Sequence, residues 1–201
     1  MKLGVTHHVL AVDVEVSGCS LTQNGIVSIG ASLQDQDSNE LHAFQVNVQL
    51  PEGRIYEEKC LKEFWRKNKK IYAFVQQNAI SPLMAMEQFD QFLTQVETTY
   101  PELILVSDNP GLDIAWLNLY LAQYTDRLSL SYAANQTYRT IWDTQSMQKV
   151  LLSQRGDFDS TCGLPKKLGF KSKWVYDHNP LNDARTIADF FNQTVKEMRK
   201  G

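Results

Sequence analysis

The sequence predicts an α/β domain in which a mixed β-sheet is flanked by helices. Two observations lead to this fold class. Three strand-like segments with short polar connections, residues 8–15, 26–33 and 41–48, open the chain and predict an antiparallel meander. Helical and strand-like segments then alternate through the remaining residues, which predicts further, parallel strands and helices that cover the sheet.

The central part of the chain alternates between helix and strand. Residues 52–79 have an irregular helical pattern, and Pro82 suits the first turn of a helix that Pro101 ends. Residues 103–107 form a short run typical of a buried strand, and residues 112–124 predict another helix. Helical spacing behind Pro82 is kept by four apolar residues: Met86, Phe89, Leu93 and Val96.

The C-terminal third predicts the last elements of the sheet and its cover. Residues 138–142 indicate a strand, and residues 146–152 indicate a helix. Residues 181–198 predict a longer amphipathic helix. Its apolar stripe consists of Ala184, Ile187, Ala188, Phe191 and Val195.

Length and composition favour one ordinary globular domain, residues 1–201. The 43% hydrophobic and 21% charged residues are typical of such a domain. No run approaches the roughly 18 apolar residues of a membrane span, and the N-terminus lacks the apolar core of a signal peptide. The three cysteines are widely separated, so we expect neither a disulfide framework nor a zinc site but a cytoplasmic location. The net charge of −3 argues against a broad basic surface for long nucleic acid.

The first candidate site lies at the end of the strand at residues 8–15. Asp13 and Glu15 are two residues apart, so both side chains project from the same face of the strand. Adjacent carboxylates near a core repel one another unless a cation binds between them. Hard oxygen ligands favour Mg²⁺ or Mn²⁺. A pair of solvated acids at a strand end is the alternative interpretation.

The second candidate is Asp113, which follows the strand at residues 103–107. Asn109 is the expected N-cap and Pro110 the expected first residue of the helix, which places Asp113 about one turn into it. The helix dipole favours an anion there, which is a structural explanation of Asp113. Asp108 is a neighbouring acid that we interpret as a cap or a supporting group of the site.

The third candidate pairs His178 with Asp183, five residues later, across the start of the last helix. A neutral imidazole with a pKa of about 6.5 can accept a proton at physiological pH. The structural alternative is a surface histidine followed by an aspartate that stabilises the helix N-terminus.

Together, these three stretches resemble the DEDDh family of 3′–5′ exonucleases, within residues 11–190. The resemblance implies a ribonuclease-H-like fold and hydrolysis of terminal phosphodiesters to nucleoside 5′-monophosphates with two divalent ions, Mg²⁺ or Mn²⁺. It implies that Asp13 bridges both ions, that Glu15 and Asp183 complete one site, and that Asp113 supports the other partly through water. His178 is the implied general base.

The resemblance also suggests groups that hold the substrate. Val14, Ser17 and Gly18 are expected to line the sugar of the terminal nucleotide, and Asn109 of the second motif is a further candidate. Residues 59–70 carry six basic side chains around two aromatic residues, loosely similar to the phage exonuclease A and mycobacterial exoribonuclease branch.

The two aromatic residues of this segment, Phe64 and Trp65, have alternative interpretations. Trp65 is the candidate for stacking on a base, whereas Phe64 is expected in the core. The alternative is an amphipathic helix that buries both rings and leaves the lysines in solvent. A second basic cluster forms either a phosphate contact or a solvated loop: Lys166, Lys167, Lys171 and Lys173.

The expected partner is therefore the 3′ end of a nucleic acid, single-stranded RNA or DNA, with no membrane. The protein is expected to be a monomer or a homodimer. Two other functions stay open: a non-catalytic nucleic-acid-binding module with the same fold, and an unrelated phosphoesterase for small molecules.

Overall fold

A five-stranded mixed sheet forms the centre of the molecule. The computed structural model describes residues 7–135, 138–159 and 162–200. The strand order is β3-β2-β1-β4-β5. The pairs β1–β2 and β2–β3 are antiparallel, whereas β4 pairs in parallel with both β1 and β5. The predicted meander with additional parallel strands is therefore confirmed.

The elements follow the predicted order closely. The strands are β1 (His8–Val16), β2 (Ile26–Asp35), β3 (Glu40–Asn47), β4 (Ile104–Ser107) and β5 (Ile141–Asp143). The helices are α1 (Glu58–Cys60), the π-helix η1 (Leu61–Trp65), α2 (Lys69–Gln76), α3 (Pro82–Thr99), α4 (Asp113–Tyr124), α5 (Thr144–Gln154), α6 (Leu164–Leu168) and α7 (Pro180–Met198).

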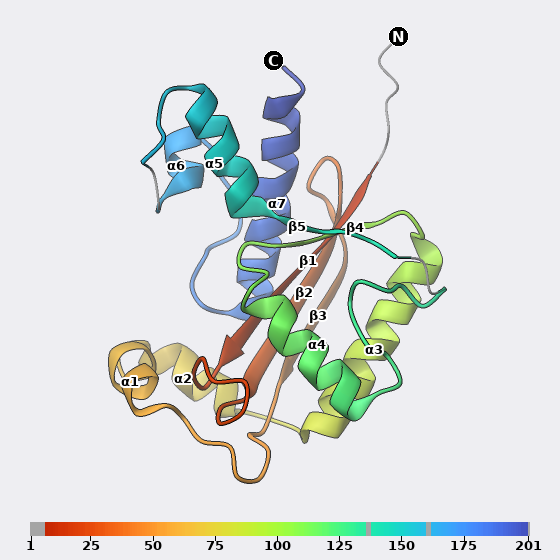
Figure 1. Cartoon of the computed structure of the whole chain (residues 1–201), viewed down its shortest axis with the longest axis vertical. Helices are drawn as coiled ribbons and strands as arrows, with labels where there is room; N and C mark the ends of the chain where they lie inside the picture. Colours follow the sequence, from red (N-terminus) through yellow and green to blue (C-terminus); the bar gives the residue numbers. More distant parts are fainter. Residues whose placement is uncertain (1–6, 136–137, 160–161, 201) are drawn as a thin grey trace.

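The central strand β1 divides two hydrophobic layers. Leu10, Val12 and Val14 pack with α3 and α4 in the larger core. Val9 and Ala11 point to the opposite face, where they pack against α7. Helices α3 and α4 therefore cover one face of the sheet, and α7 covers the other (Figure 1). Since side chains alternate along a strand, Asp13 and Glu15 belong to the α7 face.

One glycine brings the start of α7 onto the sheet. Gly30 pairs with Asp13 in the β1–β2 ladder. A Cβ atom on Gly30 would lie only 2.1 Å from the carbonyl carbon of Pro180 and 2.3 Å from the nitrogen of Leu181. The first turn of α7 therefore rests directly on the strand beside Asp13. This close approach places the His178 and Asp183 segment next to the strand that carries Asp13 and Glu15.

Two details differ from the sequence predictions. Helix α4 begins at Asp113 with Leu112 as its cap, so Asn109 is not the N-cap. Asn109 instead closes a turn, since its carbonyl accepts hydrogen bonds from the N–H groups of Leu112 and Asp113, both at 2.9 Å. Helix α6 forms where one of the two alternatives was a solvated loop, with Lys166 exposed on it. No helix within the described part of the chain has the length and apolar character required to cross a lipid bilayer.

Candidate active site

Two groups of potential ligands meet at the ends of β1 and β4. Glu15, His178 and Asp183 form one group, in which the ligand atoms lie within 4.8 Å of one another. Asp13 and two further acids form the second group within the same limit: Asp108 and Asp113. The five side chains that the sequence singled out are thus brought together from β1, α4 and the start of α7.

Asp13 lies among four other carboxylates. It is 6% exposed, and its Oδ2 atom has no hydrogen-bond partner among the described residues. Burial raises the pKa of Asp13 well above its usual value, and the charges of the four neighbouring acids raise it further: Asp113, Glu15, Asp183 and Asp108. Burial and neighbouring carboxylates likewise raise the pKa of Glu15. Such repulsion is relieved by a bound cation.

Asp113 and Asp183 are held in place by directed hydrogen bonds. The hydroxyl of Ser107 and the backbone N–H of Val14 donate to Asp113 at 2.5 and 3.4 Å. The N–H groups of Asp177 and His178 donate to Asp183 at 2.9 and 3.1 Å. Burial nevertheless raises the pKa of each carboxyl group to about 7. Both carboxylates are therefore oriented by hydrogen bonds, although burial disfavours their charged form.

His178 stands at the more open side of the site. Its side chain is 44% exposed, and its Nδ1 atom lies 3.9 Å from Oε1 of Glu15. The ring packs edge-to-face against Phe64, with 4.8 Å between the centroids. The residue has a φ of 65°, a left-handed conformation just before the N-cap of α7, Asn179. Solvent and a substrate can therefore reach an imidazole whose position is defined from two sides.

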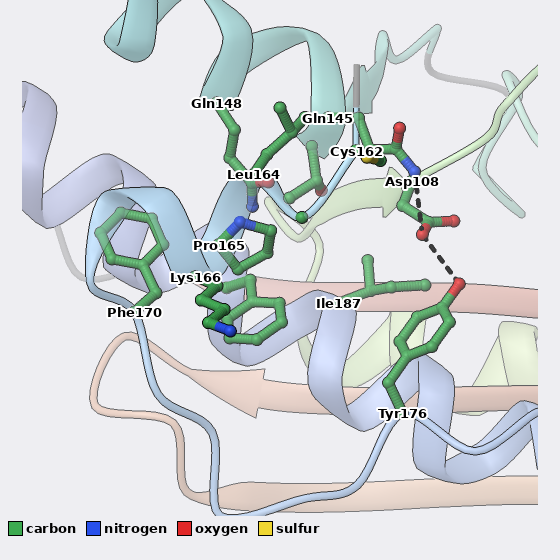
Figure 2. Close-up of a pocket in the computed structure, with 13 residues that line it drawn as sticks. Asp108, Gln145, Gln148, Cys162, Leu164, Pro165, Lys166, Phe170, Tyr176 and Ile187 are labelled. Carbon is green, nitrogen blue, oxygen red and sulfur yellow. Dashed lines mark hydrogen bonds between the residues drawn. The ribbon is translucent and has the colours of Figure 1, made fainter. Parts of the chain in front are cut away.

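Asp108 is the acid that the sequence assigned only a supporting role. The hydroxyl of Tyr176 donates to its Oδ2 atom at 3.0 Å, and the amide of Gln145 donates at 3.3 Å (Figure 2). Asp108 shares a ligand group with Asp13 and Asp113. The sequence places Asp108 five residues before Asp113, in a turn after a buried strand. Side chains in a turn do not alternate regularly, so the sequence could not predict that Asp108 points toward Asp13.

The chemistry of these two groups fits divalent cations. Four of the five acids are buried, and Asp108 is the exception. Their carboxylate oxygens are the hard ligands that Mg²⁺ and Mn²⁺ prefer. The unpartnered buried oxygen of Asp13 is the feature that a cation would complete. The acidic cluster therefore has the composition and the electrostatics of a metal centre.

A comparison with protein-family models decides the family. The model described as the 3′-5′ exoribonuclease Rv2179c-like domain matches residues 8–195. The chain belongs to this family. The three motifs predicted a 3′–5′ exonuclease, and membership of this family confirms that prediction. No curated protein sequence is significantly similar to this chain.

Solved structures show the same fold at low sequence identity. The cell-death related nuclease CRN-4 aligns with a TM-score of 0.70 at 13% identity, covering 94% of this chain and 64% of that protein, just under two thirds of its length. The nuclease domain of 3′hExo, a DEDDh family member bound to rAMP, gives 0.65 at 14% identity and covers 96% and 94%. Pop2p of S. pombe, with Mg²⁺ and Mn²⁺ bound, gives 0.60 at 15% identity and covers 96% and 82%. The predicted ribonuclease-H-like fold is confirmed.

Trp65, which was predicted to stack on a base of the substrate, is not accessible in this exoribonuclease-family protein. Its side chain is fully buried at 0% exposure, and its Nε1 donates to the carbonyl of Val16 at 3.3 Å. It packs with Val27, Ile71 and Val75 in a satellite core, so no base can stack on it. Phe64, expected in the core, is partly buried against this satellite core and also contacts His178.

Two of the positions predicted to line the sugar, Ser17 and Gly18, lie in an enclosed turn. Ser17 is buried, and its hydroxyl donates to the carbonyl of Ile55 at 2.9 Å while it accepts the N–H of Gly25. Gly18 is enclosed, since a Cβ there would meet Asn24 Oδ1 at 2.5 Å. These positions stabilise the turn that follows β1 rather than presenting a surface.

The two other predicted substrate contacts differ in accessibility. Val14 is only 4% exposed, and its side chain packs in the core. Asn109 remains exposed beside the acidic cluster.

Proposed function

We propose that this protein removes nucleotides one at a time from the 3′ end of single-stranded RNA or DNA and releases nucleoside 5′-monophosphates. The observation that carries the proposal is the position of Asp13, a buried and unpartnered carboxylate at the centre of four other acids. A nuclease that acts on a terminal phosphodiester needs such a concentration of cation ligands next to a proton acceptor. RNA is the favoured substrate, because the matching family model is described as an exoribonuclease.

Two divalent ions, Mg²⁺ or Mn²⁺, suit the two ligand groups. Glu15 and Asp183 would hold one ion beside His178, and Asp113 with Asp108 would hold the second, with Asp13 shared between them. When bound, the ions supply charge neutralisation for the phosphate and make the attacking water and the leaving oxygen more reactive. Asp108 enlarges the ligand set that the sequence suggested.

His178 is proposed to act as the general base. The oxygen of a water molecule forms a bond to phosphorus, the bond from phosphorus to the 3′ oxygen of the penultimate nucleotide breaks, and His178 accepts the proton of the water. The leaving oxygen takes a proton from solvent and becomes a 3′ hydroxyl. The 3.9 Å separation of Nδ1 from Glu15 keeps the ring at the cation-binding side of the site. Phe64 limits its rotation from the other side.

Basic side chains lie close enough to guide the substrate. Three of the six basic residues of the segment 59–70 line a hollow of about 590 Å³ together with Asp177 and Asn179, which flank His178: Lys67, Lys69 and Lys70. Lysines near an active site raise the local concentration of phosphates even when the net charge of the protein is negative. We propose that the terminal nucleotides approach His178 along this hollow. Asn109, which is exposed next to Asp108 in the sequence, is proposed as a further substrate contact. The whole chain, 1–201, is proposed to act as one catalytic domain, as a monomer or a homodimer.

Digestion of matched 5′-labelled single-stranded RNA and DNA oligonucleotides, with Mg²⁺ or Mn²⁺, tests this function. We expect a metal-dependent ladder that shortens from the 3′ end and is faster for RNA. The Asp13→Ala variant should give no ladder, because its change removes the shared ligand. His42→Ala is the matched control, since His42 packs against Tyr100 and belongs to neither ligand group.

The alternative function is a nucleic-acid-binding module without turnover. Binding of the labelled oligonucleotides without shortening in any metal would support that alternative and overturn the exonuclease. A binding module has no use for five converging acids, whose mutual repulsion costs stability.

A further inference from the structure

A second pocket adjoins the acidic cluster at Asp108 and Tyr176. It has a volume of about 470 Å³ and lies between α5, the α6 segment and α7. Asp108 and Tyr176 form one side, while Pro165, Lys166 and Phe170 form the other (Figure 2). This volume is in the range of pockets that enclose small ligands. Asp108 belongs both to this pocket and to a ligand group of the active site.

The wall of the pocket has the chemistry that a nucleobase requires. The half-buried rings of Phe170 and Phe190 line it together with the apolar side chains of Leu164 and Ile187. Aromatic rings stack on the flat face of a base, whichever base it is. Polar groups that suit the edge of a base are present in the same wall: the amides of Gln145 and Gln148 and the hydroxyl of Thr144. The combination is typical of a site that holds one aromatic heterocycle.

Thr144 is an independent indication that the pocket binds a ligand with a polar group. It is the first residue of α5 and only 2% exposed. Its Oγ1 atom is buried and has no hydrogen-bond partner among the described residues. Buried hydroxyl groups are nearly always hydrogen-bonded, because an unmet one loses its interaction with water without compensation. A polar atom of a ligand in this pocket would supply the partner.

The positions of the attacking water and of the leaving oxygen indicate which nucleotide the pocket binds, provided that the proposed function holds. Attack and departure are in line at phosphorus, so the leaving 3′ oxygen lies opposite the attacking water. His178 accepts the proton near Glu15 and Asp183, which puts departure toward Asp13, Asp108 and Asp113. We propose that the pocket binds the base of the penultimate nucleotide, the one whose 3′ oxygen leaves. Lys166, exposed at the rim, then faces the phosphate on the 5′ side of that nucleotide.

Two oligonucleotides that differ only at the penultimate residue test the assignment. One carries adenine there and the other an abasic sugar, and kcat/KM is measured for the first cleavage. For the unmodified protein we expect the adenine substrate to be favoured about 5- to 150-fold, the range that stacking of one base supplies. Phe190→Ala should slow the adenine substrate and leave the abasic one unchanged, so that the ratio approaches one.

A milder variant provides the second measurement. Thr144→Val keeps the shape of the side chain and removes its hydroxyl, so it should lower kcat/KM for adenine about 2- to 10-fold, the contribution of one hydrogen bond. Thr144→Ser should restore the rate, which a purely structural role of the methyl group would not. Phe158→Ala removes an exposed ring outside the pocket and serves as the control, with an expected ratio equal to that of the unmodified protein.

The outcomes separate the two proposals. If the unmodified protein shortens both oligonucleotides at the same rate, or if Phe190→Ala slows both equally, the pocket does not bind the penultimate base. If the ratio responds instead to an abasic residue at the 3′ terminus, the pocket binds the departing nucleotide and the assignment is wrong. If no oligonucleotide is shortened at all, the exonuclease function fails, and the pocket assignment fails with it.

Discussion

At the scale of single residues, His178 illustrates how the fold fixes a catalytic group. Its φ of 65° is a left-handed conformation that costs free energy for any residue with a Cβ atom. Such strain persists only where the surroundings fix it, and Asp183 does so by accepting the N–H groups of both Asp177 and His178. Asp183 therefore has two roles, as a proposed ligand and as the anchor of the loop that presents the imidazole.

The role of His178 is tested by its removal. His178→Ala should lower the rate of RNA shortening at neutral pH by roughly 10²–10⁴-fold, the usual contribution of a general base. Because the side chain is 44% exposed, the melting temperature should change little. Initial rates under saturating Mn²⁺ measure the effect, and a loss below about 10-fold would argue against a base at this position.

Asp108 makes a different prediction, because it is proposed to act with the ions rather than on the water. Asp108→Asn retains the amide and hydroxyl contacts with Tyr176 and Gln145 but removes one charge from the Asp13 group. The Mn²⁺ concentration for half-maximal rate should rise roughly 10- to 100-fold, with the rate at saturation largely restored. Tyr176→Phe is the control for the hydrogen bond alone. An unchanged metal requirement would return Asp108 to a supporting role.

The sequence predicted those residues whose spacing fixes their direction. Asp13 and Glu15 share a face because strand side chains alternate, and His178 and Asp183 are joined by one helix start. Asp108 escaped assignment because side chains in a turn follow no period. These limits are local, and each concerns a single side chain.

At the scale of elements, the position of α7 depends on the absence of one side chain. Gly30 of β2 leaves room for the backbone of Pro180 and Leu181, which a Cβ atom would meet at 2.1 to 2.3 Å. Backbone cannot move aside as a flexible side chain does, so the helix start must shift as a unit. Asp183 would then move away from Glu15, whose strand is held by pairing on both edges.

Gly30→Ala should therefore reduce activity more than it reduces stability. A displacement of about 1 Å costs on the order of 10²-fold in rate, whereas overpacking costs roughly 1–3 kcal/mol of unfolding free energy. Urea unfolding and RNA shortening by the same preparation measure the two effects. Gly111→Ala is the control, since its added Cβ would meet nothing nearer than Asn109 Oδ1 at 3.8 Å. Full activity in a folded Gly30→Ala protein would contradict the argument.

The π-helix η1, which contains Phe64 and Trp65, is an irregularity that the sequence analysis did not predict. The N–H of Arg66 donates to the carbonyl of Leu61, five residues back, so η1 is a π-helix. A π-turn contains one more residue than an α-turn, which rotates the following side chains relative to the expected helical phase. Trp65 is thereby turned into the core, and Phe64 is turned toward His178. The alternative of a helix that buries both rings and leaves its lysines in solvent nevertheless describes this segment well, since Phe64 is partly buried against the core of Trp65 and the lysines are exposed.

At the scale of the whole molecule, electrostatic repulsion between the carboxylates of the active site lowers the stability of the fold. Asp113 and Asp183 have pKa values of about 7 in the folded protein, well above the values of about 4 expected for the unfolded chain. The pKa values of Asp13 and Glu15 are raised in the same direction. Between these two pH values, the folded state binds more protons than the unfolded state. The unfolding free energy therefore decreases as the pH rises. The stability that the protonated carboxyl groups contribute is fully present only below about pH 4.

This sign predicts how pH and metal ions act together. In EDTA, the contribution of the cluster makes the melting temperature fall as the pH rises from about 5 through 7 to 8, because the carboxylates ionise next to one another. Mn²⁺ binds the ionised form, so it should raise the melting temperature strongly at pH 8 and weakly at pH 5. Thermal unfolding across this pH range, with and without Mn²⁺, measures both effects.

A matched variant isolates the cluster from the other titrating groups of the chain. Asp113→Asn combined with Asp183→Asn removes two of the charges while keeping the size of the side chains, so its melting temperature in EDTA should depend less on pH and respond little to Mn²⁺. If the unmodified protein gained as much stability from Mn²⁺ at pH 5 as at pH 8, the ions would not be binding to these carboxylates. The carboxylates that repel one another in the metal-free fold would then not be the ligands of the ions that the proposed reaction requires.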